Sequence, residues 1–268
     1  MKRVLAASAC ALALAAPAAD PVAFVADLRG NATIEGDGKL VFLAELNPGT
    51  KLLLGTGALV SVTYASTGAE FTFGGPGEFL VTATEVRADK GASPTRRNVA
   101  ALHDPSVVAR VARTATASVR MRSAAQDASK TPLEYPVDAR IATLQPTLRW
   151  KGGEAATVSV LDAKGKELWK GDAQPSMVRP AVKLSPATAY TWAVMTPKGV
   201  LGEARFETLP AQAMARAEKS RASARTFTDR VMHAFLLQDL GATQDAREAW
   251  AALSRERPDL PELAALAR

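Results

Sequence analysis

Cysteine and histidine are almost absent from this sequence of 268 residues. The one cysteine, Cys10, lies in an apolar N-terminal segment, and the two histidines are His103 and His233. After that segment the chain therefore has no disulfide, no cysteine nucleophile and no cysteine metal ligand. Two histidines so far apart do not form a zinc motif either. We expect neither a metal nor a cofactor in this protein.

Catalytic sequence motifs are lacking as well. There is no Gly-x-Ser-x-Gly elbow, no Gly-x-x-x-x-Gly-Lys-Ser/Thr phosphate loop and no dinucleotide fingerprint. Gly74-Gly75-Pro76-Gly77 is rich in glycine, but its proline and the strand expected after it indicate a turn. A pair of carboxylates that meets only in three dimensions, as in glycoside hydrolases, stays open at this stage. We predict that the protein is not an enzyme.

Residues 1–19 have the pattern of an export signal. Lys2 and Arg3 precede an apolar run over residues 4–16, and Ala16-Pro17-Ala18 offers the small residues of a cleavage site. The run is shorter than the roughly 20 residues of a membrane span. We therefore expect a periplasmic or secreted mature chain with no transmembrane anchor. Lipidation of Cys10 is the alternative, which its position inside the apolar run disfavours.

Residues 20–86 consist of short apolar runs separated by glycine-rich turns. Residues 59–64 alternate between apolar and polar side chains, which predicts a strand with one buried face. Regularly spaced short strands indicate an all-β domain. The predicted strands are residues 40–43, 52–54, 59–64, 70–73 and 78–81.

Turn glycines and short strands alternate through Gly30-Asn31-Ala32-Thr33-Ile34, Leu46-Asn47-Pro48-Gly49-Thr50-Lys51-Leu52, Gly55-Thr56-Gly57-Ala58-Leu59-Val60-Ser61-Val62, residues 64–73 and Gly77-Glu78-Phe79-Leu80-Val81. This pattern resembles the FecR family of periplasmic domains. The resemblance implies a binding or signal-relay module without catalysis. Signal relay in that family depends on a membrane-spanning segment and a cytoplasmic tail, which we do not expect here. Thr50 replaces the usual acidic residue, and Ser66-Thr67-Gly68 replaces an Asp-Gly-Ser type of turn.

Residues 87–131 are basic, whereas the module before them is acidic. Residues 19–86 have a formal net charge of −5 and residues 87–130 one of +6. The basic stretch could be a solvated linker, could add edge strands, or could contact an anionic envelope polymer or lipid head groups. The candidate polyanion contacts are Arg96, Arg97, Arg110 and Arg113. We predict no nucleic-acid partner.

Residues 132–210 contain the strand signals of a second β module. A strand is predicted at residues 146–150, and a hairpin joins residues 157–161 and 166–169 through Asp162-Ala163-Lys164-Gly165. The pattern Leu184-x-Pro186-x-Thr188-x-Tyr190 resembles the corner of a fibronectin type III domain, and residues 205–208 resemble its last strand. In that fold the tyrosine hydroxyl bonds back to nearby backbone.

The second module is shorter than the ~100 residues of an immunoglobulin-like sandwich, so a trimmed sandwich is expected. Its aromatic residues Trp150, Trp169, Tyr190 and Trp192 could form a sugar-binding platform. We expect Trp150, Tyr190 and Trp192 in the core instead, because such folds bury aromatic residues at these places.

Residues 211–268 are predicted to form a helical hairpin. Residues 212–225 are rich in strong helix formers, and the next apolar residues recur at helical spacing up to Gly241. Thr243 is expected to cap the following helix, which Pro258 ends. Ala234, Gly241, Ala246, Trp250 and Pro258 are spaced as in a tetratricopeptide repeat, although Arg230 and His233 stand where large apolar residues are usual. The hairpin either docks on the β modules or offers a groove to a partner helix.

The expected fold is mainly β, with a FecR-like module (20–86), a basic linker (87–131), a small immunoglobulin/fibronectin-like sandwich (132–210) and a C-terminal helical hairpin (211–268). The predicted function is that of a non-enzymatic periplasmic binding or scaffold protein. It would mediate protein–protein interaction in the cell envelope, with signalling as one role and an envelope protein, membrane-bound or not, as the partner. A peptidoglycan- or glycan-binding envelope protein is the alternative.

Overall fold

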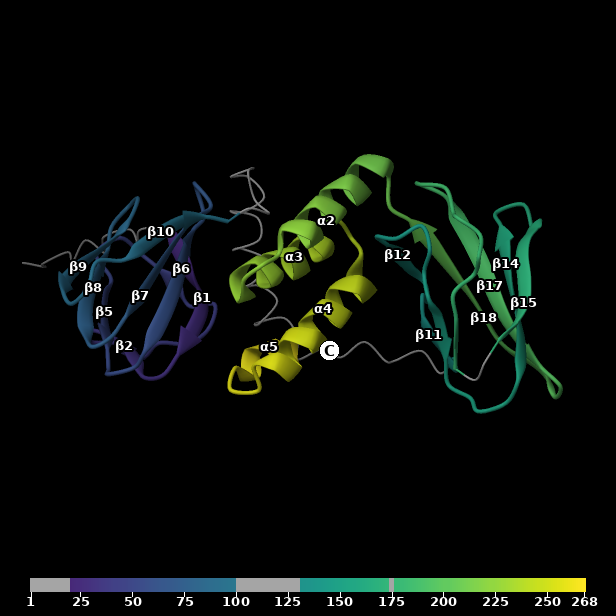
Figure 1. The fold of residues 1–268 in the computed structure, drawn as a ribbon, viewed down its shortest axis with the longest axis horizontal. Helices are drawn as coiled ribbons and strands as arrows, with labels where there is room; N and C mark the ends of the chain where they lie inside the picture. Colours follow the sequence, from purple (N-terminus) through teal and green to yellow (C-terminus); the bar gives the residue numbers. More distant parts are fainter. Residues whose placement is uncertain (1–19, 100–130, 174–175) are drawn as a thin grey trace, which may run out of the picture.

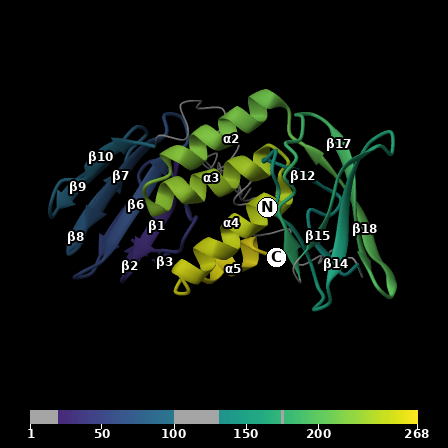
Figure 2. The same cartoon turned by 45° about the vertical axis from the view of Figure 1, so that its right-hand side comes forward.

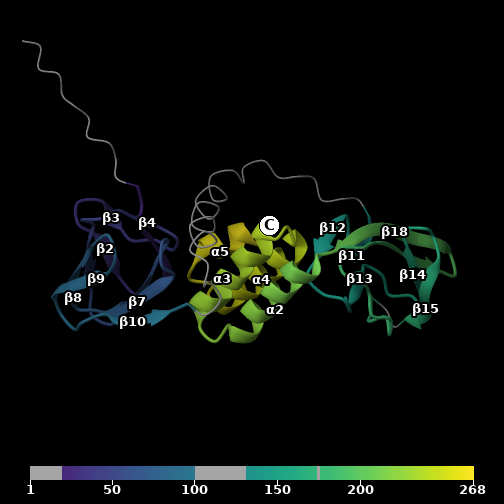
Figure 3. The ribbon, with the colours of Figure 1, turned by 90° about the horizontal axis from the view of Figure 1, so that it is seen from above.

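The computed structural model describes residues 20–99, 131–173 and 176–268. Two β modules lie at opposite ends of the molecule, and the helices α2 to α5 lie between them (Figure 1). The two other views show the same order (Figures 2 and 3). The predicted fold class, mainly β with a C-terminal helical region, is confirmed.

The first β module consists of two five-stranded antiparallel sheets, with strand orders β10-β7-β6-β1-β4 and β3-β2-β5-β8-β9. Apolar side chains of both sheets form one core that contains Leu52, Val60, Tyr64 and Phe79, each with no exposed surface. The strands are β1 (Ala23–Arg29), β2 (Ala32–Ile34), β3 (Gly38–Lys39), β4 (Glu45–Leu46), β5 (Lys51–Leu54), β6 (Leu59–Tyr64), β7 (Ala69–Gly74), β8 (Gly77–Val81), β9 (Val86–Lys90) and β10 (Thr95–Asn98).

The strand predicted at residues 40–43 is wrong, because this segment forms a turn in which Leu43 has a φ of 63°. Its apolar residues are nevertheless buried. Leu40 belongs to the core of the first β module, whereas Phe42 and Leu43 pack against the helices. The segment is apolar because the core of the first β module covers one side of it and the helices cover the other. A short apolar run in the sequence does not distinguish such a buried turn from a strand.

Gly30 is a turn residue at which both the backbone conformation and the surrounding atoms require glycine. Its φ is +74°, and a Cβ atom placed on it would lie 2.9 Å from the Cα atom of Ala58. Gly36 has a similar φ of +80°, but no atom lies within 4 Å of its Cβ position. Both positions therefore favour glycine for its conformational freedom, and Gly30 also requires it for space.

Two strands lie partly or wholly within the predicted linker 87–131. β9 pairs with β8 and β10 pairs with β7, and each forms an edge of one sheet. Residues 86–98 thus belong to the first β module in the structure. The other edge-strand candidates, at residues 107–111 and 119–121, lie outside the described residues.

The second β module combines a three-stranded sheet, β11-β13-β16, with a five-stranded sheet, β12-β18-β17-β14-β15. The parallel pairing of β12 with β18 is the exception among otherwise antiparallel pairs of the described residues. The strands are β11 (Leu133–Tyr135), β12 (Ala139–Ile141), β13 (Leu148–Trp150), β14 (Ala156–Asp162), β15 (Glu167–Ala173), β16 (Met177–Val178), β17 (Ala189–Thr196) and β18 (Gly199–Thr208).

Aromatic side chains form the core of the second module, as predicted. Trp150, Tyr190 and Trp192 are 2%, 4% and 0% exposed. The Tyr190 hydroxyl accepts a hydrogen bond of 2.8 Å from the backbone N–H of Ser185. The bond expected for a fibronectin-type corner is therefore present.

The C-terminal region has four helices where a single hairpin was expected, namely α2 (Ala211–Ser223), α3 (Phe227–Asp239), α4 (Thr243–Glu256) and α5 (Pro261–Leu266). Phe235 of α3 and Trp250 of α4 make an edge contact, with ring centroids 4.7 Å apart. Gly241 follows the C-cap of α3 and has a left-handed conformation, with a φ of +83°. The capping role predicted for Thr243 is wrong, because the N-cap of α4 is Ala242 and makes no side-chain cap bond.

Candidate interaction site

The four helices, here called the helical bridge (α2 to α5), contact both β modules. On the side of the first module, an apolar core combines Phe24, Phe42 and Val99 with residues of α3, α4 and α5. On the side of the second module, Leu209 and Ala142 pack against apolar residues of α2, α3 and α4. The bridge therefore joins two modules that have separate cores of their own.

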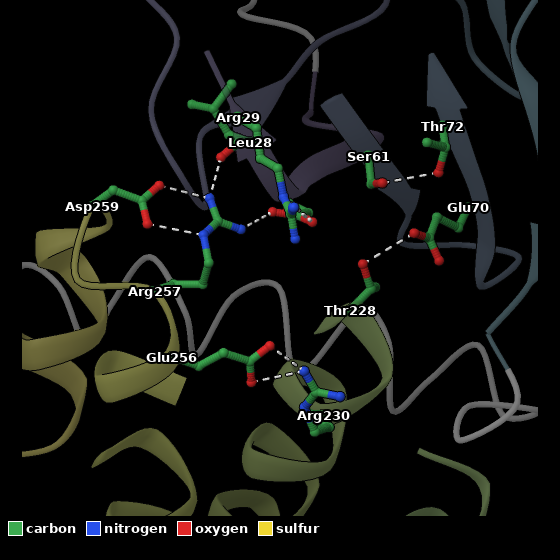
Figure 4. A network of polar contacts seen from close by, with 11 residues as sticks. Leu28, Arg29, Ser61, Glu70, Thr72, Thr228, Arg230, Glu256, Arg257 and Asp259 are labelled. Atoms are coloured by element: carbon green, nitrogen blue, oxygen red, sulfur yellow. Dashed lines mark hydrogen bonds and ion pairs between the residues drawn. The ribbon is translucent and has the colours of Figure 1, made fainter. Parts of the chain in front are cut away.

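Arg257, at the C-terminal end of α4, anchors the bridge to strand β1. Its guanidinium donates to a carboxylate oxygen of Asp27 and to the carbonyl oxygen of Leu28, both at 2.5 Å, and also to Asp259 (Figure 4). Only 8% of the Arg257 side chain and 14% of that of Asp27 are exposed. The guanidinium also lies 5.1 Å from the ring centroid of Phe227. Such a buried charged group is tolerated because each of its partners accepts a hydrogen bond.

A second anchor joins α3 to strands β7 and β10. Arg97 of β10 forms ion pairs with Glu70 of β7 and with Asp229 of α3, and the two carboxylates are each 3% exposed. The Thr228 hydroxyl donates to Glu70 at 3.0 Å (Figure 4). One guanidinium thus neutralises an acidic group from each side of the interface.

The pKa values of the two carboxylates in this anchor are shifted in opposite directions. Burial raises the pKa of Glu70, and the charge of Arg97 and the Thr228 hydroxyl offset this only in part. Burial also disfavours the charge of Asp229, but hydrogen bonds from Thr226 and Arg97 outweigh it and lower its pKa. Asp229 also completes a capping box with Thr226, the N-cap of α3. The same carboxylate therefore starts the helix and docks it.

The contact with the second β module is centred on Asp245, in the first turn of α4. Its carboxylate accepts hydrogen bonds of 2.6 Å from the Tyr135 hydroxyl and from the backbone N–H of Ala142. Gln244 accepts a bond of 2.9 Å from the backbone N–H of Val137. Burial raises the pKa of Asp245 above its usual value, against the effect of these donors.

Arg149 of β13 adds a charge to this second contact. It forms an ion pair with Glu248 of α4 and lies 4.8 Å from the ring centroid of Tyr135. Tyr135 thus contacts Arg149 within the second module and Asp245 across the interface. The pKa of its hydroxyl is strongly raised by burial and by the charge of Asp245, so it stays a hydrogen-bond donor.

A cavity of about 340 Å³ opens where α2, α3 and α4 meet the second module. His233 lies in its lining and its Nδ1 is 3.1 Å from the Ser220 hydroxyl. Burial and the charge of Arg221 lower the pKa of His233, so the imidazole is neutral at pH 7. The lining consists of Ala142, Thr143, Ala217, Glu218, Arg221, His233, Leu237 and Asp245.

The residues predicted to contact a polyanion are not brought together as a set. Arg96 is exposed on β10, whereas Arg97 is engaged with Glu70 and Asp229. Arg110, Arg113 and the lone linker histidine His103 lie outside the described residues. The polyanion contact stays a prediction.

The anchoring residues Arg257, Asp229 and Asp245 were missed by the sequence analysis. Thr226-Phe227-Thr228-Asp229 has the spacing of a capping box, which could have revealed Asp229 as a helix start. No sequence signal marks Arg257 or Asp245 as an anchor, because their partners in the β modules lie more than one hundred residues away in the chain.

Within the described ranges, no helix is long and apolar enough to span a membrane. The same ranges contain no group of three or more histidine, cysteine, aspartate or glutamate side chains that could hold a metal ion.

Comparison with protein-family models gives no match, and comparison with curated protein sequences gives none either. Among solved structures, the chain is similar to the crystal structure of CopC from Methylosinus trichosporium OB3b, with 21% sequence identity and a TM-score of 0.24. The alignment covers 30% of this chain and 93% of that chain. With so low a TM-score, no conclusion about fold or function rests on this similarity.

Proposed function

We propose that this chain is a non-enzymatic scaffold and binding protein of the bacterial cell envelope, acting through protein–protein interaction. The observation that carries the proposal is the attachment of one helical bridge to both β modules through buried charged groups. Buried ion pairs contribute little net stability compared with apolar contacts, but they specify one geometry. A bridge anchored in this way holds two binding modules at a fixed separation.

The cellular place of this scaffold rests on the N-terminal segment. Lys2, Arg3 and the apolar run over residues 4–16 support export to the periplasm. Osmotic-shock fractionation of a bacterial host tests this part. The chain should be released with periplasmic markers, and a variant with Lys2→Glu and Arg3→Glu should accumulate in the cytoplasm. Equal retention of both proteins in the cytoplasm would contradict export.

Crosslinking in cells tests the scaffold itself. The tagged full chain should give a discrete crosslinked adduct whose second protein is identified by mass spectrometry. The variant Asp245→Ala, which removes the central contact with the second module, should weaken the adduct at equal protein level. Glu167→Ala, an exposed position on β15, is the matched control and should leave the adduct unchanged. A chain that stays uncrosslinked, or an adduct insensitive to Asp245→Ala, would refute the proposal.

A second candidate function, binding of peptidoglycan or another anionic glycan, is favoured by the exposed Arg96 on β10 and the basic stretch around it. Sedimentation with purified peptidoglycan at low salt tests it. The triple variant Arg96→Gln, Arg110→Gln and Arg113→Gln should reduce sedimentation, since each removes a cation. Arg97 is left in place because it docks the helical bridge. Absence of sedimentation of the unmodified chain would exclude this candidate.

A further inference from the structure

A second cavity lies in the second β module, where the β17–β18 hairpin meets the end of β13. Its volume is about 350 Å³, which is within the range of small-ligand sites. Figure 1 shows this hairpin at the end of the molecule far from the helices. The lining residues are Trp150, Gly152, Gly153, Glu154, Thr196, Lys198, Gly199, Val200 and Leu201.

Trp150 is the notable polar group of this cavity. Its side chain is in the core and only 2% of the residue is exposed. Its indole N–H has no hydrogen-bond partner among the described residues, and its nitrogen is not one of their fully buried unpaired atoms, so it faces the cavity and solvent reaches it. The neighbouring Trp192 differs, because its indole N–H donates to the carbonyl oxygen of Pro136 at 2.7 Å. An acceptor on a ligand would take the place of solvent at this N–H, and the apolar atoms of the same ligand would be removed from water in the cavity.

The glycine after β13 leaves this indole edge open to the cavity. A Cβ atom on Gly152 would lie 3.5 Å from Cδ1 and 3.7 Å from Nε1 of Trp150. Those are ordinary contact distances, so a side chain there would cover the N–H without a clash. Gly153 lines the same cavity but has no atom within 4 Å of its Cβ position.

The other polar groups of the lining already have partners. Glu154 and Lys198 form an ion pair with each other at the rim. The Thr196 hydroxyl donates to the carbonyl oxygen of Gly199 at 3.1 Å and accepts from the backbone N–H of Lys198. Among the described side chains of the lining, the Trp150 indole is the donor without a partner and the two charges compensate each other, which favours a neutral ligand.

Exposed apolar side chains lie on the β17–β18 hairpin that borders the cavity. Val200 is 65% exposed, and Met195, which lies opposite it across the hairpin, is 54% exposed. These are the two most exposed large hydrophobic residues of the described chain. Exposed apolar side chains beside a cavity are typical of interaction sites.

We infer that this cavity binds an apolar side chain of a partner protein, whose neighbouring main-chain carbonyl accepts a hydrogen bond from the Trp150 indole N–H. A peptide segment supplies both groups that the cavity lacks, an apolar side chain and a neutral acceptor. A sugar fits less well, because Trp150 is 2% exposed and packs against Trp192, so its ring does not form an exposed platform for stacking. The inference rests on the proposed function as a protein-binding scaffold and names where a partner binds.

Titration of the purified full chain by NMR tests this inference independently of any cellular partner. The chain has four tryptophans, so its indole N–H groups give four signals, and that of Trp150 reports directly on the cavity. The probe is N-acetyl-leucinamide, which carries an apolar side chain and two amide carbonyls. We expect a saturable downfield shift of the Trp150 indole proton, with a dissociation constant on the order of millimolar for so small a ligand.

Two matched comparisons make the test specific. N-acetylglycinamide lacks the side chain and should bind about tenfold more weakly or worse. Gly152→Ala should weaken binding of N-acetyl-leucinamide by at least about tenfold, whereas Gly153→Ala should leave it unchanged, and the other three indole signals verify that both variants fold. The inference is overturned if the Trp150 signal does not shift saturably, if N-acetylglycinamide or N-acetylglucosamine shifts it equally, or if Gly152→Ala binds like the unmodified chain. Because no cellular adduct enters this test, its failure leaves the scaffold proposal intact.

Discussion

Replacement of Arg257 by methionine should loosen the attachment of the helical bridge to the first β module. Methionine keeps an apolar stem beside Phe227 but removes the guanidinium. Asp259 is 57% exposed, so its pair with Arg257 accounts for only about 0–1 kcal/mol. Asp27 and the Leu28 carbonyl lose buried partners, and breaking a buried pair costs about 3–5 kcal/mol. Because Arg29 stays 3.9 Å from Asp27 and compensates in part, we expect a loss of about 3 kcal/mol.

Native-state hydrogen exchange is the assay for this loss, because a chain with several cores need not unfold in one transition. A loss of about 3 kcal/mol corresponds to a roughly hundredfold rise in the opening constant of amides in α3 and α4. Arg230→Met is the matched control. Arg230 pairs with Glu256 inside the bridge, and the two side chains are 38% and 47% exposed. Such a pair is worth about 0–1 kcal/mol.

Equal exchange rates in Arg257→Met and Arg230→Met would refute this reasoning. A double-mutant cycle with Asp27→Asn refines it further. If Asp27 is the main partner, the two substitutions together should cost clearly less than the sum of their single effects. Strict additivity would show that the Leu28 carbonyl and the Phe227 ring account for the loss instead.

Three further predictions follow from single contacts. Burial raises the pKa of Asp245 above its usual 3.8, so the folded state binds a proton on this carboxyl group more tightly than the unfolded state does. The contribution of Asp245 to the free energy of unfolding therefore falls as pH rises from 3.8 through its folded pKa. Asp245→Asn should therefore gain stability relative to the unmodified chain across that window in urea unfolding, and a pH-independent difference would contradict this. Tyr190→Phe should lower the stability of the second module by about 1–2 kcal/mol, measured by thermal unfolding, through loss of its corner bond. Gly30→Ala should cost clearly more than Gly36→Ala, for which about 1 kcal/mol is expected, and equal urea midpoints for the two variants would argue against crowding at residue 30.

The elements that could be predicted from the sequence are those whose apolar residues recur with the period of the element. In β6 this period appears in the sequence although the structure buries both faces, Ser61 and Thr63 included, so the single buried face expected there is wrong. The β6 and β7 strands, the β14–β15 hairpin and the helix α3 each show the period of their structure. Strand β1 shows no such period, because Phe24 and Ala26 face the helices while Ala23 and Val25 face the module core. A strand covered on both faces reads as a continuous apolar run.

The candidate site was less predictable than the fold, for a physical reason. Arg97 was singled out as a cation free to bind a polyanion, yet in the structure two carboxylates from distant parts of the chain occupy it. Charge patterning identifies where cations lie, but whether a cation is free depends on contacts between modules. Asp245 likewise resembles any acidic residue in the first turn of a helix until Tyr135 is placed beside it.

Asp229 links the folding of the helical bridge to its docking. Its carboxylate accepts the backbone N–H of Thr226 in the capping box and the guanidinium of Arg97 from the first module. If α3 frays at its N-terminus, the Asp229 carboxylate moves away from the position in which it contacts Arg97. If the Arg97 guanidinium is removed, the buried carboxylate keeps only the hydrogen bonds at the start of α3. Either loss lowers the stability of the other, so the start of α3 and the first-module interface should form together. The bridge is therefore a stable spacer only in contact with its β module, which is what a scaffold of fixed geometry requires.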